Sequence, residues 1–201
     1  MRRRQQALFG VGQIDGGEPD LGQSQLTRPP PQPLHQRLPV HPMPTAHAPI
    51  LGTRTLHWPD EAACAACAAR FALRPALADA YIELHGPLGA GKTTFVRHLL
   101  RALGVQGRIK SPTYAVLEPY ALPGLAISHF DFYRFDDPRE WADAGFRELF
   151  AAPGLKLAEW PEKAAGMLPR PDLRIHIEPT HDDDREVRTE AVTHRGLELL
   201  E

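Results

Sequence analysis

The sequence is poor in cysteine. Its 201 residues include two, Cys64 and Cys67, which excludes a disulfide framework and is typical of a protein from a reducing compartment. The two thiols lie in an alanine-rich segment, and no second cysteine pair is available to complete a zinc site. We therefore expect both side chains to pack in the core rather than to bind metal or exchange electrons.

Long apolar runs and a strong net charge are also missing. No apolar run approaches the roughly 18 residues of a membrane-spanning helix. The arginines at positions 2–4 are not followed by the apolar stretch of a secretory signal. The formal net charge of −2 does not indicate a nucleic-acid-binding surface. These absences predict a cytoplasmic protein.

The first 49 residues contain no lysine and only scattered aliphatic side chains, but hold 9 of the 21 prolines. Such a segment cannot bury enough apolar surface to offset the entropy of ordering. We expect residues 1–49 to be disordered and residues 50–201 to form one folded domain. Met43, just ahead of that domain, is the expected true start of the chain.

From residue 50 onward, apolar segments alternate between strand and helix patterns, as in α/β proteins. Expected strands span residues 50–57, 81–85, 113–120, 125–133, 155–159, 172–178 and 185–192, and expected helices span 59–73, 92–103 and 136–144. Pro123-Gly124 predicts a hairpin between the third and fourth strands, so the sheet is expected to be mixed. The apolar side chains of Phe146, Leu149 and Phe150 are expected to be core.

One turn carries a complete phosphate-binding motif. Residues 86–94 read GPLGAGKTT, which matches G-x-x-x-x-G-K-[ST] between a strand and a helix. Glycines let successive backbone N–H groups face inward, and the helix adds the positive end of its dipole. Lys92 is expected to contact the β and γ phosphates of ATP, and Thr93 to bind Mg²⁺. The expected ATP-binding residues are Pro87, Leu88, Gly89, Ala90, Gly91, Lys92, Thr93 and Thr94.

Three further segments offer chemistry beside this loop. Thr113 follows the stiff Ser111-Pro112 dipeptide and could sense the γ-phosphate, or could simply enter a strand. Asp131 stands in an apolar strand and could face Mg²⁺, or could form an ion pair with Arg134 or His129. Glu159 stands at the end of a predicted strand, which is where α/β folds put their ligand sites. It could order water or hold the metal's water shell, or could begin a helix.

Together these segments resemble the TsaE family of P-loop ATPases, also called YjeE. The resemblance rests on residues 86–94 and on Ser111-Pro112-Thr113-Tyr114, His129-Phe130-Asp131-Phe132-Tyr133-Arg134 and Glu159-Trp160-Pro161. It covers about residues 55–180. It implies a P-loop NTPase-type three-layer fold with a mixed, mainly parallel sheet containing an antiparallel hairpin. Cys64 departs from the family, which tends to carry threonine near this position.

The resemblance also implies a function. Members support the threonylcarbamoyl modification of adenosine 37 in tRNA, bind ATP and Mg²⁺, and hydrolyse ATP slowly when alone. They act with the TsaD–TsaB pair, through which they meet tRNA indirectly. Lys92 would take the phosphates, Thr93 the Mg²⁺, and Thr113 the γ-phosphate. Asp131 and Glu159 would form the acidic pair around metal and water, and Trp160 would face the partner.

Two other functions remain open. The first is a small-molecule or nucleoside kinase, although little chain remains for an acceptor lid. The second is a binding module in which ATP holds a complex together without being hydrolysed. A guanine-reading GTPase is disfavoured because the sequence has no Asn-Lys-x-Asp segment.

Overall fold

The structure is a computed structural model that describes residues 49–135, 137, 141 and 145–201. The expected disordered segment, apart from residue 49, and most of the expected helix over residues 136–144 lie outside the described residues. Within them, no helix is long and apolar enough to cross a membrane.

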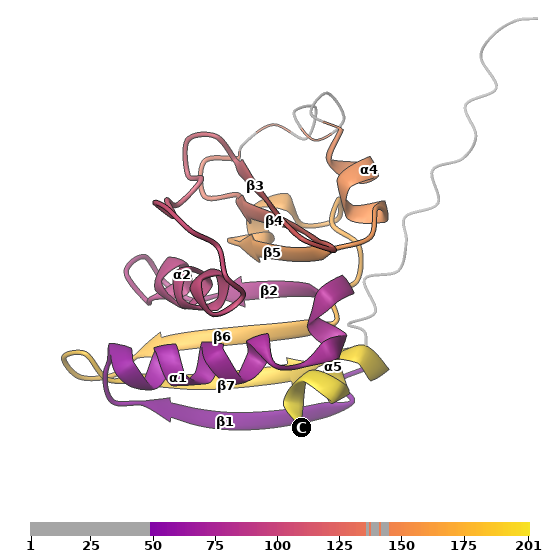
Figure 1. The fold of residues 1–201 in the computed structure, drawn as a ribbon. Helices are drawn as coiled ribbons and strands as arrows, with labels where there is room; N and C mark the ends of the chain where they lie inside the picture. The colour runs from indigo at the N-terminus through magenta and orange to yellow at the C-terminus, as the bar shows by residue number, and fades with distance from the viewer. Residues whose placement is uncertain (1–48, 136, 138–140, 142–144) are drawn as a thin grey trace, which may run out of the picture. The chain divides into compact units, whose positions relative to one another are not determined.

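Seven strands of the described chain form one mixed sheet (Figure 1). They are β1 (Gly52–Trp58), β2 (Tyr81–His85), β3 (Leu117–Leu122), β4 (Leu125–Asp131), β5 (Leu155–Glu159), β6 (Leu173–Pro179) and β7 (Arg185–Ala191). Their order in space is β1-β7-β6-β2-β5-β4-β3. Strands β6, β2, β5 and β4 are parallel neighbours, and β3 and β7 run antiparallel to their neighbours. The predicted mixed α/β sheet with its hairpin is confirmed.

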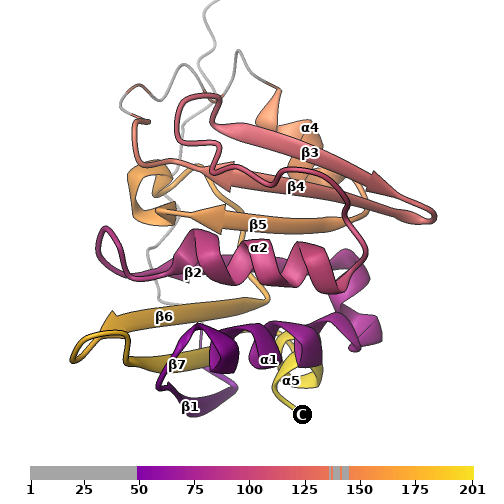
Figure 2. The ribbon, with the colours of Figure 1, turned by 60° about the vertical axis from the view of Figure 1, so that its left-hand side comes forward.

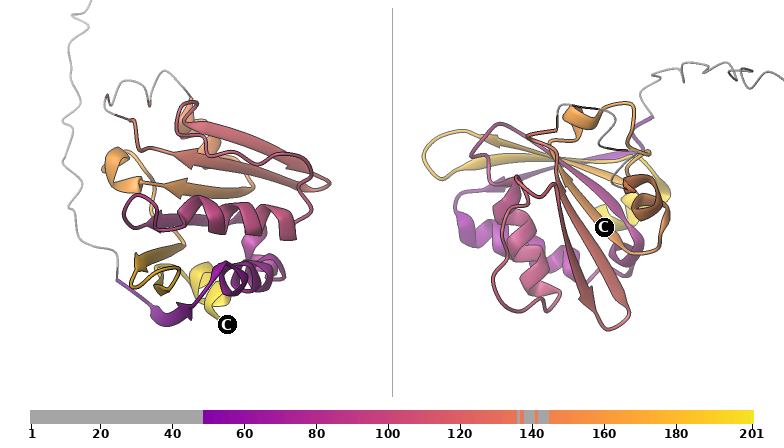
Figure 3. Two further views of the ribbon diagram at one scale, coloured as in Figure 1. Left: turned by 90° about the vertical axis from the view of Figure 1, so that its left-hand side faces the viewer. Right: turned by 90° about the horizontal axis from the view of Figure 1, so that it is seen from above.

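Three helices cover one face of the sheet: α1 (Glu61–Ala72), α2 (Lys92–Ala102) and α5 (His194–Leu200). Figure 2 shows all three in front of the strands, and the left view of Figure 3 places α1 and α2 on the same side. The alternation of side chains along each strand creates this face, because Ile82 and Leu84 point toward the helices while Tyr81 packs in a separate cluster. The Asp60 side chain caps α1 by accepting from the Ala63 N–H at 2.8 Å.

A second, aromatic core lies on the opposite face of β4 and β5. It contains Phe130, Phe132 and Phe146, with Phe150 stacked on Phe130 at a ring distance of 4.8 Å. Helix α4 (Phe146–Ala151) supplies two of these rings, so the prediction that this apolar group is core is confirmed. Two short 3-10 turns, η1 (Pro75–Asp79) and η2 (Pro161–Ala164), join the larger elements.

The expected strand over residues 113–120 is wrong at its start. Residues 113–116 form a turn in which the Val116 N–H donates to the Pro112 carbonyl at 2.6 Å. Val116 has φ of +65°, a left-handed conformation that cannot continue a strand. Strand β3 therefore begins at Leu117, and Thr113 lies in the loop ahead of it.

Candidate functional site

The glycine-rich loop between β2 and α2 has the backbone of a phosphate-binding turn. Gly86, Gly89 and Gly91 have φ of +135°, +80° and +109°, which side-chain-bearing residues rarely adopt. A larger residue is also sterically excluded at Gly86, because a Cβ there would lie 2.3 Å from the Ile177 carbonyl oxygen on β6. Gly91 precedes α2, and no described side chain caps that helix. Its first N–H groups are therefore available to an anion.

Lys92 is folded back into this loop and is 4% exposed. Its Nζ donates to the carbonyls of Gly86 at 2.6 Å and Pro87 at 2.9 Å. The same ammonium lies 3.9 Å from the ring centroid of Trp160. Burial lowers the pKa of Lys92, and the nearby carboxylates, chiefly that of Glu159, oppose the shift. The loop thus holds one buried positive charge at the start of α2.

Thr93, the next residue, is tied to the end of β5. Its hydroxyl lies 2.9 Å from both carboxylate oxygens of Glu159. Glu159 Oε1 is also 2.8 Å from Nε2 of His129 on β4. The side chains of His129 and Glu159 are 0% and 2% exposed. A buried carboxylate and the hydroxyl of the P-loop threonine are thus in direct contact.

Asp131 lies beside Glu159 in register across β4 and β5 but has different partners. Its Oδ2 accepts from the hydroxyls of Ser111 at 2.8 Å and Thr113 at 2.5 Å. Its Oδ1 accepts from the Tyr133 N–H at 3.0 Å. Asp131 therefore fastens the loop ahead of β3 to the end of β4.

These contacts differ from the structural alternatives considered for the two acidic residues, which were an ion pair for Asp131 and a place at the start of a helix for Glu159. Among the described residues, Asp131 forms no ion pair with Arg134 or His129. Arg134 instead stacks on the Tyr114 ring at 4.3 Å, and His129 bonds to Glu159. Glu159 ends β5 and points at Thr93 rather than capping the turn that follows.

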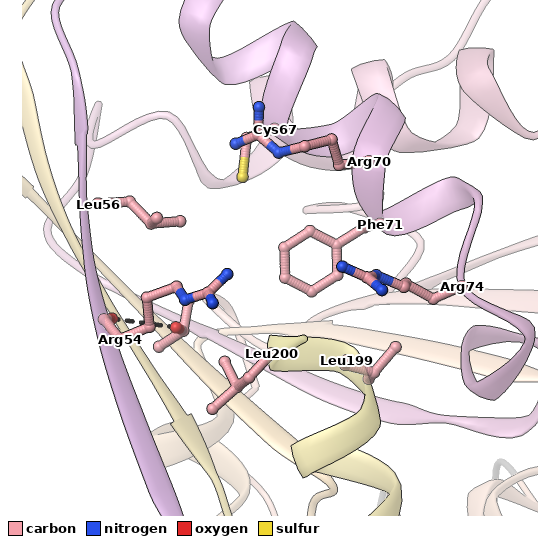
Figure 4. A pocket seen from close by; sticks show the side chains of 9 residues that line it. Arg54, Leu56, Cys67, Arg70, Phe71, Arg74, Leu199 and Leu200 are labelled. Atoms are coloured by element: carbon pink, nitrogen blue, oxygen red, sulfur yellow. Dashed lines mark hydrogen bonds between the residues drawn. The ribbon is translucent and has the colours of Figure 1, made fainter.

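A cavity of about 300 Å³ opens between the P-loop and the ends of β4 and β5. Its lining consists of Leu88, Gly89, Ala90, Gly91, Lys92, Thr93, Thr94, Ser111, Thr113, Asp131, Tyr133, Glu159 and Trp160. A second cavity of about 180 Å³ shares Gly89–Gly91 and Thr94 with it and extends to the start of α1. Figure 4 shows a third pocket, of about 40 Å³, at the far end of α1 among Arg54, Phe71 and Leu200. This third pocket contains none of the P-loop residues.

Comparison with known proteins decides the family. A family model described as threonylcarbamoyl adenosine biosynthesis protein TsaE matches residues 58–187. The chain belongs to the TsaE family. A Haemophilus influenzae protein named tRNA threonylcarbamoyladenosine biosynthesis protein TsaE is 42% identical over 119 residues, which are 59% of this chain and 75% of that protein. A Bacillus subtilis protein of the same name is 38% identical over 120 residues, 60% of this chain and 75% of its own length.

The fold agrees with that of a solved TsaE-like structure. The crystal structure of Bacillus subtilis YdiB matches with a TM-score of 0.59 and 29% identity, over 74% of this chain and 92% of that chain. Membership in the TsaE family gives the chain a role in tRNA threonylcarbamoyladenosine biosynthesis.

Most of the residues predicted for a TsaE site meet around one cavity. Residues 88–94, Thr113, Asp131 and Glu159 all line it. Pro87 is not part of the lining, although its carbonyl accepts from Lys92.

Sequence reasoning missed His129 as a partner of Glu159. The available signal was the two-residue spacing of His129 and Asp131, which puts both side chains on one face of a strand.

The donor set fits magnesium. Mg²⁺ prefers oxygen ligands and is usually held by one or two carboxylates together with substrate phosphates rather than by an all-protein cage. The cavity offers the Thr93 hydroxyl and the carboxylates of Glu159 and Asp131. In the described part of the chain, no group of three or more His, Cys, Asp or Glu side chains could hold a metal alone.

The two cysteines of this TsaE-family chain pack in the core, as expected. Both are free, and they lie on the buried face of α1, in the core. Burial raises the pKa of Cys64 to about 12 and also raises that of Cys67. Protonated thiols are poor nucleophiles and poor metal ligands.

Proposed function

We propose that this chain binds ATP with Mg²⁺ in the P-loop cavity and hydrolyses it in support of tRNA threonylcarbamoylation. The observation that carries the proposal is the direct contact between the Thr93 hydroxyl and the buried Glu159 carboxylate, at 2.9 Å, beside the ammonium of Lys92. A hydroxyl, a carboxylate and an ammonium at a helix N-terminus are the groups that phosphoryl transfer needs.

The triphosphate would lie along the start of α2. The N–H groups of residues 88–94 and the ammonium of Lys92 would bind its phosphates. Thr93 and Glu159, with Asp131 nearby, would hold Mg²⁺, which when bound neutralises charge on the phosphate oxygens. The 180 Å³ cavity on the α1 side of Thr94 has room for the nucleoside.

Glu159 and Asp131 would have different roles in hydrolysis. Glu159 contacts Thr93, so it would act at the metal side and order the attacking water. Asp131 binds Ser111 and Thr113, so it would place the loop that reads the γ-phosphate. Hydrolysis would remove the group that this loop contacts, as in nucleotide switches.

The proposed partners are TsaD and TsaB, in the cytoplasm, with tRNA met through their complex. Two large side chains at or next to residues that line the cavity are exposed: Leu88, which lines it, is 74% exposed, and Tyr114, which follows the lining residue Thr113, is 85% exposed. Such side chains beside a nucleotide site are suited to a partner that responds to the nucleotide state.

The test is ATP hydrolysis by the purified chain, with and without the TsaD–TsaB pair. We expect Glu159→Gln to retain ATP binding and to reduce hydrolysis by about a hundredfold or more. Glu148→Gln is the matched control, because Glu148 is exposed on α4 and does not line the cavity. It should leave the rate nearly unchanged.

Two results would overturn the proposal. A labelled γ-phosphate that appears on an acceptor other than water would identify a kinase. A Glu159→Gln protein that supports tRNA modification as well as the wild type would identify a binding module without catalysis.

A further inference from the structure

His129 has no assigned part in this site, yet it is its most deeply buried polar group. It lies on β4 with 0% of its side chain exposed, and its Nε2 is 2.8 Å from Glu159 Oε1. Its other ring nitrogen, Nδ1, is buried and has no hydrogen-bond partner among the described residues. An aliphatic side chain would fill this space without burying an unpartnered nitrogen. The contact that a histidine adds here is the one to Glu159.

The proton arrangement follows from the donor inventory. A carboxylate can only accept, so we assign to His129 the tautomer that carries its hydrogen on Nε2, toward Glu159 Oε1. Thr93 has a single hydroxyl proton, while both oxygens of Glu159 lie 2.9 Å from its Oγ1. Thr93 donates this proton to the Glu159 carboxylate, whose Oε1 is also bonded to His129. The lone pairs of Thr93 Oγ1 then point away from Glu159.

We propose that His129 is a positioning residue: its Nε2–H fixes the Glu159 carboxylate, which in turn orients the Thr93 hydroxyl for magnesium. The inference rests on the proposed function, since it assigns a role at the same site. Without His129, Thr93 is the only described side chain that donates to Glu159. The carboxylate is then held by one rotatable hydroxyl, and the lone pairs of that hydroxyl lose their fixed direction.

If His129 has this role, a variant that lacks its Nε2–H should lose part of the increase in ATP affinity that Mg²⁺ produces. Its affinity for ATP without metal should be unchanged. The measurement is the dissociation constant for ATP with excess Mg²⁺ and with excess EDTA, together with thermal unfolding. His129→Leu removes the donor, and we expect the magnesium enhancement of affinity to fall roughly tenfold, as for a lost hydrogen bond to a charged group. Affinity in EDTA should stay within about twofold of the wild type, because the phosphate contacts of Lys92 and the loop remain.

Two polar variants keep the test decisive if the leucine protein does not fold. Glutamine can place an N–H near the position of Nε2, whereas asparagine is too short and reaches only the position of Nδ1. His129→Gln should keep the enhancement within about threefold of the wild type, and His129→Asn should lose it as leucine does.

The inference is overturned if glutamine and asparagine give the same magnesium enhancement, or if the leucine variant weakens binding equally with and without metal. These results differ from a failure of the proposed function. In that case the wild-type chain would itself show no ATP affinity or no response to magnesium, which would overturn both.

Discussion

Replacing Lys92 with methionine removes the one buried charge of the P-loop while keeping a long apolar side chain. A hydrogen bond from an ammonium to a phosphate contributes about 1.5–3 kcal/mol. The ammonium donates to the carbonyls of Gly86 and Pro87, and binding a phosphate must compete with these bonds. We therefore expect the lower part of that range, a loss of ATP affinity of about 10–50-fold.

The stability of the fold should barely change. Pro87 is exposed, so water can replace the lost donor at that carbonyl. Burial also lowers the pKa of Lys92, so removing its charge relieves a desolvation penalty. We expect the free energy of unfolding to change by no more than about 1 kcal/mol.

Calorimetric titration with magnesium ATP, together with thermal unfolding, measures both effects. Arg97→Met is the matched control, because it removes the same charge from the same helix and Arg97 is not part of the cavity lining. The reasoning is refuted if Lys92→Met binds ATP within threefold of the wild type. An equal loss in Arg97→Met would refute it as well, since the effect would then come from net charge.

Three further predictions concern the loop, the switch segment and pH. Gly86→Ala should destabilise the fold by about 1–3 kcal/mol or prevent folding, since its Cβ would lie 2.3 Å from the Ile177 carbonyl oxygen; chemical denaturation measures this. Thr113→Val should keep ATP affinity within a few-fold but speed hydrogen exchange at residues 111–116, because one of the bonds to Asp131 is lost. Burial and neighbouring cations lower the pKa of His176 to about 4. The unfolded chain then takes up this proton first, so up to about 3 kcal/mol of stability should be lost as pH falls from about 6.5 to 4. Denaturation of His176→Asn across that range should show a shallower slope, and an equal slope would refute the assignment.

The elements that could be predicted are those whose signal is local. The P-loop is a continuous motif, and β2 and β5 are short apolar runs whose predicted bounds match the structure. Helix α5 could not be predicted, because it has only seven residues and contains Gly196. That glycine is required by tertiary contact: a Cβ there would lie 2.0 Å from the Asp172 carbonyl oxygen. The packing of Leu199 against the core, rather than helix propensity, stabilises this segment.

The partners of the site residues were harder to predict than the residues. Asp131 stands within an expected apolar strand and Glu159 ends one, and these positions marked both as candidates. Which hydroxyl each one binds depends on the register of β4 against β5 and on the path of the loop ahead of β3. The turn at Val116, with its left-handed backbone, brings Thr113 back to Asp131. No local pattern encodes that return, because valine is not expected in this conformation.

The register of β4 against β5 places two carboxylates side by side that are bonded to different parts of the proposed nucleotide site. Asp131 and Glu159 are paired neighbours on adjacent parallel strands, about 4.8 Å apart. Glu159 is bonded to the first turn of α2 through Thr93, whereas Asp131 is bonded to the loop that carries Ser111 and Thr113. A group bound between them contacts the rigid helix on one side and the loop on the other. Loss of that group would leave the loop held to the sheet by the bonds from Ser111 and Thr113 to Asp131, whereas the helix would keep its own core packing.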